Sequence, residues 1–211
     1  EAYGMTRVYS PEDGRRLGLQ GMIADMIQTA RRDLSSDLPK DLDGLTAGDA
    51  AALARVITAI EDGRLPKALL NEIKTIADGR DTVPVLGITG TGGAGKSSLT
   101  DEIVRRFRFG SGEPRIAVIA IDPTRRKTGG ALLGDRIRMN ANNAANVFFR
   151  SLATRDAKTE VPPPLADIIA AVKASGADIV IIETPGIGQG DAGIVPFCDL
   201  SLYVMTPEFG A

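Results

Sequence analysis

The sequence predicts an α/β fold in which helices flank a mostly parallel β-sheet. From Val83 onward, apolar β-rich runs alternate with amphipathic runs, which is typical of parallel strands joined by helical crossovers. The first apolar run leads directly into Gly90–Ser97, a glycine-rich segment that ends in Lys-Ser. With 211 residues, 43% of them apolar, the chain can bury the core that such a sheet needs.

The composition excludes several classes of function. The chain has 25 basic and 27 acidic residues, and this net charge of −2 gives no overall attraction to nucleic acid or an anionic membrane. No apolar run approaches the length of a membrane span. Histidine is absent, which removes His bases, His metal ligands and His-containing triads. Catalysis is therefore expected to rest on carboxylates, lysine and Mg²⁺.

The one cysteine, Cys198, cannot form a disulfide within the chain. We expect a buried, inert thiol, because unpaired cysteines commonly behave as small apolar residues. A reducing cytoplasm fits this cysteine usage.

The first 45 residues are predicted to hold a helix and a linker. Residues 1–30 show apolar positions at helical spacing after a turn-like segment, Ser10–Gly14, which indicates one amphipathic helix behind a loop. Residues 31–45 are polar and turn-rich, without a period, and indicate a linker.

Two further helices are predicted before the sheet. The first runs from Thr46 to Gly63, with Asp49 completing an approximate capping box. The second opens at Pro66 and closes near Gly79. Because both have one apolar face, they could pack against each other as a helical hairpin.

Five strands and three helices are predicted for the rest of the chain. The strands are the apolar runs Val83–Thr89, Ile116–Ile121, Val147–Phe149, Ile179–Glu183 and Leu200–Met205. The helices are the amphipathic runs Ser97–Arg108, Gly134–Asn143 and Pro164–Ser175.

The segment Gly90–Ser97 matches G-x-x-x-x-G-K-[ST], the pattern of a phosphate-binding loop. In such a loop, backbone N–H groups surround phosphate oxygens, the lysine reaches the β- and γ-phosphates, and the hydroxyl ligates Mg²⁺. A strand-like run before it and a helical run after it favour nucleotide binding over an ordinary glycine-rich turn. Nucleotide-binding roles are predicted for Gly92, Gly93, Ala94, Gly95, Lys96, Ser97 and Ser98.

Three carboxylates lie at or near predicted strand ends, where ligands of open α/β sheets bind. Asp122 directly follows the second strand, and Asp135 lies in a glycine-containing stretch that suits a mobile loop. Glu183 begins Glu-Thr-Pro-Gly, an acid-x-x-Gly segment like the one that senses the γ-phosphate in many P-loop enzymes. We predict that these carboxylates, together with Ser97, organise Mg²⁺, with Thr184 as a weaker candidate. The alternative is a strand-end surface charge.

Three other features are weaker candidates. Gln189 could orient an attacking water, as a Gln near this segment does in some GTPases, although its offset differs. The basic run Arg125–Lys127 could reach phosphates or simply be solvated. Arg138 is included among the nucleotide-binding residues. The candidate catalytic residues are Lys96, Asp122, Glu183 and Gln189.

Together these motifs resemble the G-protein chaperones of adenosylcobalamin-dependent acyl-CoA mutases. The resemblance rests on three segments in the same order: Gly90–Ser97, Ile121–Arg136 and Glu183–Gly190. In addition, Tyr9–Ile23 looks like the closing segment of a cobalamin-binding domain, which stand-alone chaperones lack before the G domain. The chain is thus similar to the family of fused isobutyryl-CoA mutases, in which a cobalamin domain, a G domain and a mutase barrel follow one another.

The resemblance implies a parent protein that interconverts isobutyryl-CoA and n-butyryl-CoA by cobalamin radical chemistry. Its G domain would hydrolyse GTP to gate cofactor loading and protect the mutase. GTP and Mg²⁺ are the ligands implied for this chain, with adenosylcobalamin and the acyl-CoA bound elsewhere in a cytoplasmic, homodimeric parent. The implied partners are the mutase and cobalamin-binding domains of the same parent, with no nucleic acid and no membrane.

The same resemblance divides the chain into three regions. Residues 1–30 would be the tail of the cobalamin domain, residues 31–80 a linker with a helical hairpin, and residues 81–211 an incomplete P-loop GTPase domain. The cobalt-ligating His would lie upstream of Glu1. The Asn-Lys-x-Asp motif that reads guanine would lie after Ala211, so a preference for guanine over adenine is implied by the family alone.

Two alternatives remain open. One is a stand-alone mutase chaperone or another P-loop NTPase such as a metallochaperone, and the cobalamin-like segment speaks against it. The other is a non-hydrolysing regulatory module whose nucleotide state only sets contacts with a mutase. Turnover of GTP distinguishes this module from an enzyme.

Overall fold

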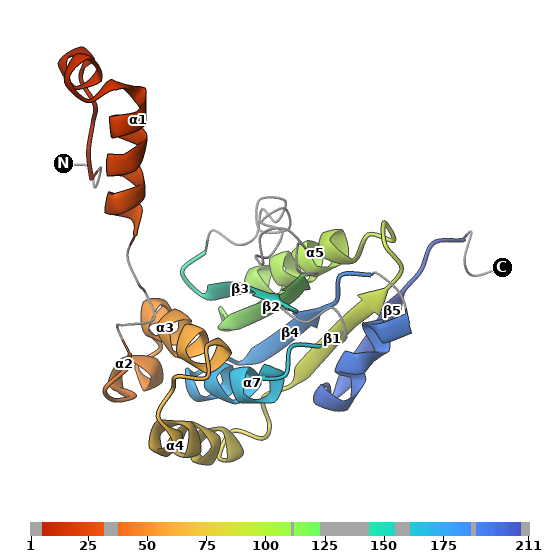
Figure 1. The fold of residues 1–211 in the computed structure, drawn as a ribbon. Coiled ribbons are helices and arrows are strands. Elements are labelled where there is room, and N and C mark those ends of the chain that lie inside the picture. The colour runs from red at the N-terminus through yellow and green to blue at the C-terminus, as the bar shows by residue number, and fades with distance from the viewer. Residues whose placement is uncertain are drawn as a thin grey trace. The chain divides into compact units, whose positions relative to one another are not determined.

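The computed structural model describes residues 6–31, 38–110, 112–122, 144–154, 161–186 and 189–207. The chain divides into two compact units, Glu1–Asp37 and Leu38–Ala211. The first unit contains one helix, and the second contains a sheet with its covering helices (Figure 1). No helix in the described part of the chain has the length and apolar character that a membrane crossing requires.

The helix of the first unit, α1, spans Pro11–Ala30. Ser10 is its N-cap: the Ser10 side chain accepts from the Asp13 N–H, and the Asp13 carboxylate accepts from the Ser10 N–H. The predicted turn at Ser10–Gly14 is therefore wrong, because this segment starts the helix. A proline at the first helical position suits a helix start as well as a turn.

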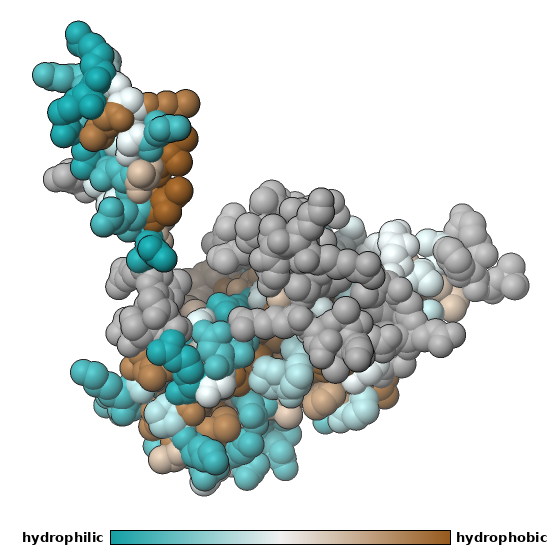
Figure 2. All heavy atoms as spheres, in the orientation of Figure 1, coloured by the Kyte–Doolittle hydropathy of each residue, from teal (hydrophilic) through white to brown (hydrophobic). Residues whose placement is uncertain are grey.

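The backbone of α1 is interrupted at Gly18, whose φ of 62° is not helical. Beyond this kink, large apolar side chains stay exposed, and Figure 2 shows apolar side chains gathered along one side of the helix. The exposed apolar side chains of α1 are Leu19, Ile23, Met26 and Ile27. The predicted helix is thus present, and its large apolar side chains are exposed.

The second unit is built on a five-stranded parallel sheet with the order β3-β2-β4-β1-β5. Its strands are β1 (Val85–Gly90), β2 (Ile116–Asp122), β3 (Val147–Ala153), β4 (Ile179–Glu183) and β5 (Leu200–Val204). All five predicted strands are present, and the predicted α/β fold is confirmed. Every residue of β2 and of β4 is buried, which explains why both strands are continuous apolar runs in the sequence.

Strand β3 continues to Ala153, beyond the predicted end at Phe149. The charged side chain of Arg150 ends the apolar run in the sequence and so hides the rest of the strand. In the structure this guanidinium forms an ion pair with the partly buried carboxylate of Glu61. The partner that allows a charge in this strand comes from a distant helix, which a local pattern cannot predict.

The helices of the second unit agree in part with the prediction. Those observed are α2 (Asp43–Thr46), α3 (Ala50–Glu61), α4 (Lys67–Asp78), α5 (Lys96–Phe109) and α7 (Leu165–Ala174), with the 3₁₀ segment η3 (Gln189–Phe197) before β5. Helices α4, α5 and α7 match their predicted ranges closely. The predicted helix Gly134–Asn143 lies outside the described residues.

Helix α3 begins at Ala50, so the start predicted at Thr46 is wrong. Asp49 is the N-cap itself, and its carboxylate accepts from the Ala51 N–H at 2.8 Å. Thr46 ends α2, and its hydroxyl lies 3.1 Å from the Leu42 carbonyl oxygen. The predicted capping box is therefore absent: Asp49 alone caps α3, and the Thr46 hydroxyl bonds back within α2.

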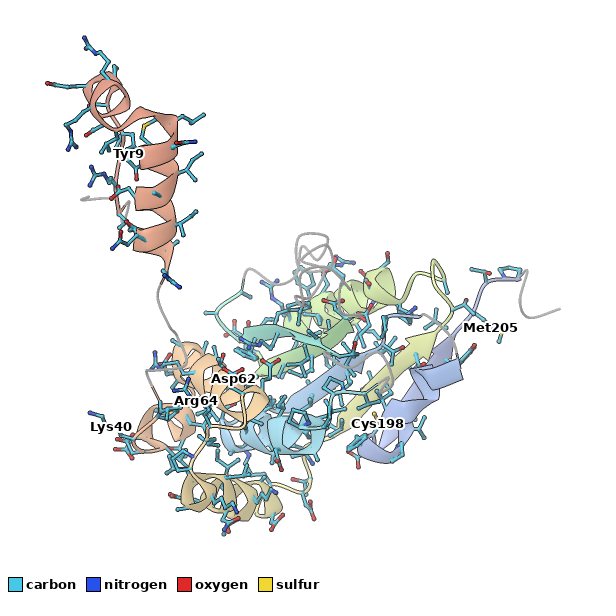
Figure 3. The ribbon with its side chains drawn as sticks, viewed as in Figure 1. Tyr9, Lys40, Asp62, Arg64, Cys198 and Met205 are labelled. Carbon is cyan, nitrogen blue, oxygen red and sulfur yellow. The ribbon has the colours of Figure 1, made fainter. Side chains whose placement is uncertain are left out.

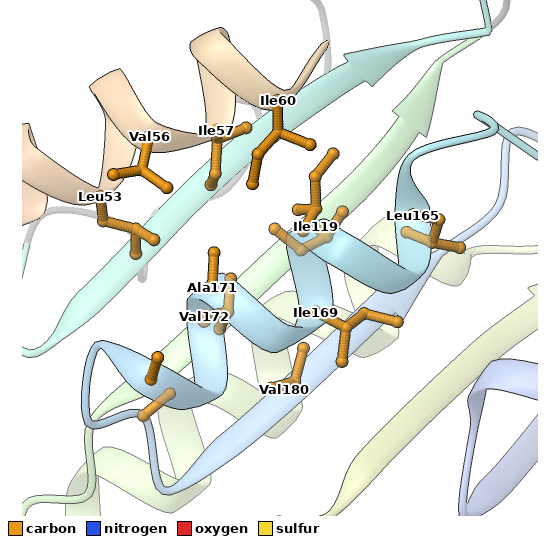
Figure 4. Close-up of a cluster of buried hydrophobic side chains, with 14 of the residues drawn as sticks. Leu53, Val56, Ile57, Ile60, Ile119, Leu165, Ile169, Ala171, Val172 and Val180 are labelled. Atoms are coloured by element: carbon orange, nitrogen blue, oxygen red, sulfur yellow. The ribbon is translucent and has the colours of Figure 1, made fainter. Parts of the chain in front are cut away.

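Helices cover both faces of the sheet (Figure 1). On one face α3 and α4 pack chiefly against α7. Figure 4 shows Leu53, Val56 and Ile57 of α3 facing Ala171 and Val172 of α7. The helices that the sequence assigns to a linker thus share one core with the sheet, and they do not form a separate hairpin.

The opposite face carries a smaller core under α5. Val104 of this helix is fully buried with Ile88, Val118 and Ile181, which come from three neighbouring strands. This packing fixes α5 against β1 and β4, so the start of the helix and the ends of these strands are held close together.

Candidate nucleotide-binding site

The connection from β1 to α5 is the phosphate-binding loop that the sequence predicts. Gly95 is the N-cap of α5, with φ 92°, a left-handed conformation that strains residues with a Cβ. No side chain caps this helix end. The first N–H groups of α5 therefore have no intrahelical acceptor, and such groups together with the helix dipole favour anions.

Lys96 is almost fully buried, with 6% of its surface exposed. Its ammonium donates to the carbonyl oxygens of Gly90 at 3.0 Å and Thr91 at 2.9 Å. These contacts hold a positive charge inside the loop that the helix start completes. Phosphate oxygens that enter the loop would compete with the two carbonyls for this ammonium.

Glu183 joins β4 to the first turns of α5. The Ser97 hydroxyl donates to Glu183 Oε1 at 2.5 Å, and the Thr100 hydroxyl lies 2.8 Å from Oε2. Ile88 is the register partner of Glu183, so β4 ends beside the point where β1 enters the loop. The structure thus brings together the predicted residues Ser97 and Glu183, which are 86 positions apart in the sequence.

Asp122 lies at the same edge of the sheet. It is the last residue of β2 and is 2% exposed. The register pairs Ala120 with Glu183, which places Asp122 two residues further along the neighbouring strand. Both carboxylates therefore lie at the carboxyl ends of parallel strands, as predicted.

Thr184 is buried and faces β1. Its hydroxyl lies 3.3 Å from that of Thr89, and its N–H donates to the Ile88 carbonyl oxygen at 3.0 Å. These contacts fix the segment after Glu183 against β1. The Thr184 hydroxyl is thus engaged between strands, and this makes it the weakest of the candidate metal ligands.

A cavity of about 510 Å³ opens over the loop and the first turns of α5. Its described lining consists of Gly93, Gly95, Lys96, Ser97, Ser98, Asp101, Glu102, Glu183, Thr184 and Pro185. Six of these were predicted as site residues on the loop or at Glu183, and Thr184 was the weaker candidate. A cavity of this size can hold the phosphate groups of a nucleotide.

Gly186 closes the acid-x-x-Gly segment and packs directly on the loop. Its φ is 75°, and a Cβ there would lie 2.1 Å from Lys96 Nζ and 2.9 Å from both Gly90 O and Gly92 N. Only a residue without a side chain fits at this position. The acid-x-x-Gly segment and the phosphate-binding loop are thus in direct contact at Gly186.

Several candidates cannot be placed. Asp135, Arg138 and the run Arg125–Lys127 lie outside the described residues. Gln189 is the first residue of η3, but its side chain is not among the described ones.

Sequence reasoning missed Thr100 and the two acids of α5 that line the cavity. Thr100 lies one turn after Ser97, and this helical spacing was the available signal. Glu102 receives hydrogen bonds from Arg105 and Arg106, which lower its pKa to about 2. The Glu102 carboxylate thus lines the cavity already paired with two arginines, and it stays ionised in mild acid.

The half-buried Cys198 lies between η3 and β5 (Figure 3). Its thiol donates to the Ile194 carbonyl oxygen at 3.2 Å. Burial raises the pKa of this thiol to about 11. The expectation of an unreactive thiol agrees with these values, although burial is only partial.

A comparison with known protein families identifies the family of this chain. The family described as "Methylmalonyl Co-A mutase-associated GTPase MeaB" matches residues 53–211. The chain belongs to this family. The match begins inside α3, so the MeaB region includes helices that precede the predicted GTPase domain.

Curated relatives extend this result. The MeaB-family chain is 61% identical over its whole length to the fused isobutyryl-CoA mutase of Cupriavidus metallidurans, and 58% identical over 97% of its length to that of Nocardia farcinica. It spans about 19% of each of these relatives. The resemblance to the fused mutases is therefore confirmed, and the chain corresponds to about a fifth of such a protein.

More distant relatives share the same region. The methylmalonic aciduria type A homolog of Caenorhabditis elegans is 31% identical over 79% of this chain, which spans 45% of that protein. Among solved structures, an LAO/AO transport system kinase matches with a TM-score of 0.56 and 26% identity, over 77% of this chain and 48% of the other. These matches support the P-loop α/β fold of the MeaB-family chain.

Proposed function

We propose that this chain is the GTP-binding and GTP-hydrolysing chaperone domain of a fused adenosylcobalamin-dependent isobutyryl-CoA mutase. The observation that carries the proposal is the joining of the phosphate-binding loop to the acid-x-x-Gly segment, through Ser97 with Glu183 and Lys96 with Gly186. Family membership supports GTP as the nucleotide. In the parent, hydrolysis gates cofactor loading and protects the mutase that interconverts isobutyryl-CoA and n-butyryl-CoA.

The phosphates bind at the start of α5. The N–H groups of the loop and the helix N-terminus, from Gly92 to Ser98, donate to phosphate oxygens, and the Ala94 N–H gives up its bond to the Thr91 carbonyl oxygen. Lys96 exchanges its contacts with Gly90 and Thr91 for the β- and γ-phosphates. Because the ammonium is already held in the loop, little side-chain freedom remains to be lost when the nucleotide binds.

The residues at this edge fit Mg²⁺. A serine hydroxyl has one proton and two lone pairs. Ser97 gives its proton to Glu183, so its lone pairs remain for a metal ion. Mg²⁺ in nucleotide sites is commonly bound by one or two protein ligands together with phosphate oxygens, and the Ser97 hydroxyl suits such a site.

We assign the remaining ligands to the carboxylates of this edge. Asp122 and Glu183 act directly or through water, and Asp135 and Thr184 stay as further candidates. The ion, when bound, neutralises charge that develops on the transferred phosphoryl group. Glu183 keeps the Ser97 proton turned away from that ion, and Lys96 stabilises the phosphate oxygens.

Gly186 makes the acid-x-x-Gly segment sensitive to the γ-phosphate. A γ-phosphate held by Lys96 would lie next to the Gly186 backbone, because the two residues are in contact. Gain or loss of that phosphate therefore changes the packing of Gly186 on the loop. We propose that Gln189, at the start of η3, orients the attacking water, and that Arg138 contacts the nucleotide.

The chain corresponds to one region of the longer parent protein. We propose that residues 1–30 close the cobalamin-binding domain, and that adenosylcobalamin and the acyl-CoA bind elsewhere in a homodimeric, cytoplasmic parent. The packing of α3 and α4 on α7 supports a GTPase domain that begins near Leu38 instead of residue 81.

Nucleotide competition tests this function. The full-length parent is titrated with a fluorescent GTP analogue in Mg²⁺, and GTP and ATP compete for the site. We expect binding that GTP displaces at much lower concentration than ATP. Equal displacement by the two nucleotides would contradict the assignment to GTP, and no binding would remove the nucleotide site.

A further inference from the structure

Thr100 is a fully buried polar residue whose role the phosphate-binding motif does not include. It lies on α5, one helical turn after Ser97, and none of its surface is exposed. Its hydroxyl is 2.8 Å from Glu183 Oε2 and 3.0 Å from the Lys96 carbonyl oxygen. Thr100 therefore contacts the carboxylate that holds Ser97, at its other oxygen.

The Thr100 hydroxyl has one proton and two acceptors within reach. Threonines inside helices often bond back to the carbonyl four residues earlier, which for Thr100 is that of Lys96. A carboxylate is the stronger acceptor, because hydrogen bonds to an ionised group are shorter and stronger than neutral ones. The shorter distance is the one to Glu183, so the geometry assigns the proton to the carboxylate.

The result is a chain of three side chains in which Glu183 accepts from two hydroxyls of α5. Thr100 holds Oε2, and this fixes the plane of the carboxylate and turns Oε1 toward Ser97. Without the Thr100 hydroxyl, the buried carboxylate loses one of the donors that fix its terminal torsion. Ser97 would then lose the fixed acceptor that directs its proton.

We propose that Thr100 is a positioning residue for Mg²⁺: through Glu183 it orients the Ser97 hydroxyl so that the lone pairs of that oxygen face the cavity. This inference rests on the proposed function of the site. It predicts that Thr100 affects metal-dependent nucleotide binding and leaves the metal-independent part unchanged.

The test is the Mg²⁺ dependence of nucleotide affinity in the full-length parent. Thr100→Val keeps the shape of the side chain and removes the hydroxyl. In this variant, the Mg²⁺ concentration that gives half of the maximal increase in affinity for a fluorescent GDP analogue should rise about tenfold, the effect of one hydrogen bond to a charge. Affinity in EDTA should stay within about twofold of wild type. Thr100→Ser should restore the wild-type Mg²⁺ dependence.

Thr75→Val is the matched control. Thr75 also bonds back to a helical carbonyl, that of Asn71 at 3.1 Å, but belongs to α4. This variant should show wild-type Mg²⁺ dependence. Thr100→Ala removes the hydroxyl without placing a methyl group against the Glu183 carboxylate, and it should repeat the Thr100→Val result if the valine variant is insoluble.

The outcomes separate this inference from the function on which it rests. If wild type binds the analogue in a Mg²⁺-dependent way and both hydroxyl-free variants match it, the positioning role is wrong and the proposed function stands. An equal rise in Thr100→Ser would also overturn the inference, because the hydroxyl would then not be the active group. If wild type shows no nucleotide binding, both the function and the inference are wrong.

Discussion

Gly186 lies so close to Lys96 that a Cβ on the glycine would come within 2.1 Å of the lysine ammonium. The two residues belong to different motifs, the acid-x-x-Gly segment and the phosphate-binding loop. Their contact means that the lysine expected to hold the γ-phosphate and the segment expected to sense it cannot move independently.

This contact predicts that Gly186→Ala impairs nucleotide binding. The added methyl group must displace Lys96 from the loop, and we expect triphosphate affinity to fall by about tenfold or more, the effect of a lost charge-assisted hydrogen bond. The matched control is Gly63→Ala. Gly63 has a similar φ of 64°, but open space surrounds its missing Cβ.

Both glycine variants should lose about 1–2 kcal/mol of stability from left-handed strain. Isothermal titration with a GTP analogue then distinguishes the effect of backbone strain, which both variants share, from the effect of the clash with Lys96, which only Gly186→Ala has. Equal affinities in the two variants would show that Gly186 does not act through Lys96.

Lys96→Ala tests the loop itself. Because one charge-assisted hydrogen bond contributes about 1.5–3 kcal/mol, we expect triphosphate affinity to fall by roughly 10- to 100-fold. Lys67→Ala, at an exposed position at the start of α4, should leave the affinity unchanged. A titration of the full-length parent gives the comparison, and unchanged affinity in Lys96→Ala would remove this residue from the site.

The phosphate-binding loop and the sheet could be predicted because their signals are local. The loop is one continuous motif, and strands buried on both faces, such as β2 and β4, are continuous apolar runs. The link between Thr100 and Glu183 was missed because it joins residues 83 positions apart. The extension of β3 was missed for the same reason, since Arg150 finds its partner in α3.

The place of α3 shows another limit of local patterns. An amphipathic helix has the same period in a linker hairpin and in a domain core, so the sequence could not tell which surface its apolar face covers. The structure shows that this surface is α7. The sequence therefore predicted the helix but not its packing partner, because the partner depends on the tertiary fold.

If α3 belongs to the core, Ile57→Ala should destabilise the GTPase domain. Ile57 is fully buried in the larger cluster. We expect a loss of about 2–5 kcal/mol in the free energy of unfolding, as for other buried large-to-small changes. Arg55→Ala, at an exposed position on the same helix, is the control. Hydrogen exchange of the β2 and β4 amides reports on the stability of this domain alone. Equal protection in Ile57→Ala and Arg55→Ala would show that α3 is not part of the domain core.

The raised pKa of Cys198 predicts a thiol that reacts slowly with alkylating reagents. With a pKa of about 11, the thiol stays protonated at pH 8, and the thiolate is the reactive form. Alkylation by iodoacetamide should therefore be slower than that of glutathione at pH 8 and should rise about tenfold per pH unit up to about pH 10. Mass spectrometry of the Cys198 peptide measures the rate. A rate that levels off near pH 8 would show an ordinary, exposed thiol.

The central claim is that this site hydrolyses GTP, and release of labelled phosphate from γ-labelled GTP by the full-length parent in saturating Mg²⁺ tests it most directly. We predict steady turnover by wild type and a rate at least about tenfold lower for Glu183→Gln, because that change removes the charge that supports the metal. Nucleotide affinity should change much less than the rate. Glu72→Gln, on the exposed side of α4, should hydrolyse like wild type. Binding without turnover in wild type would make the domain a regulatory module, and full turnover in Glu183→Gln would remove Glu183 from the metal site.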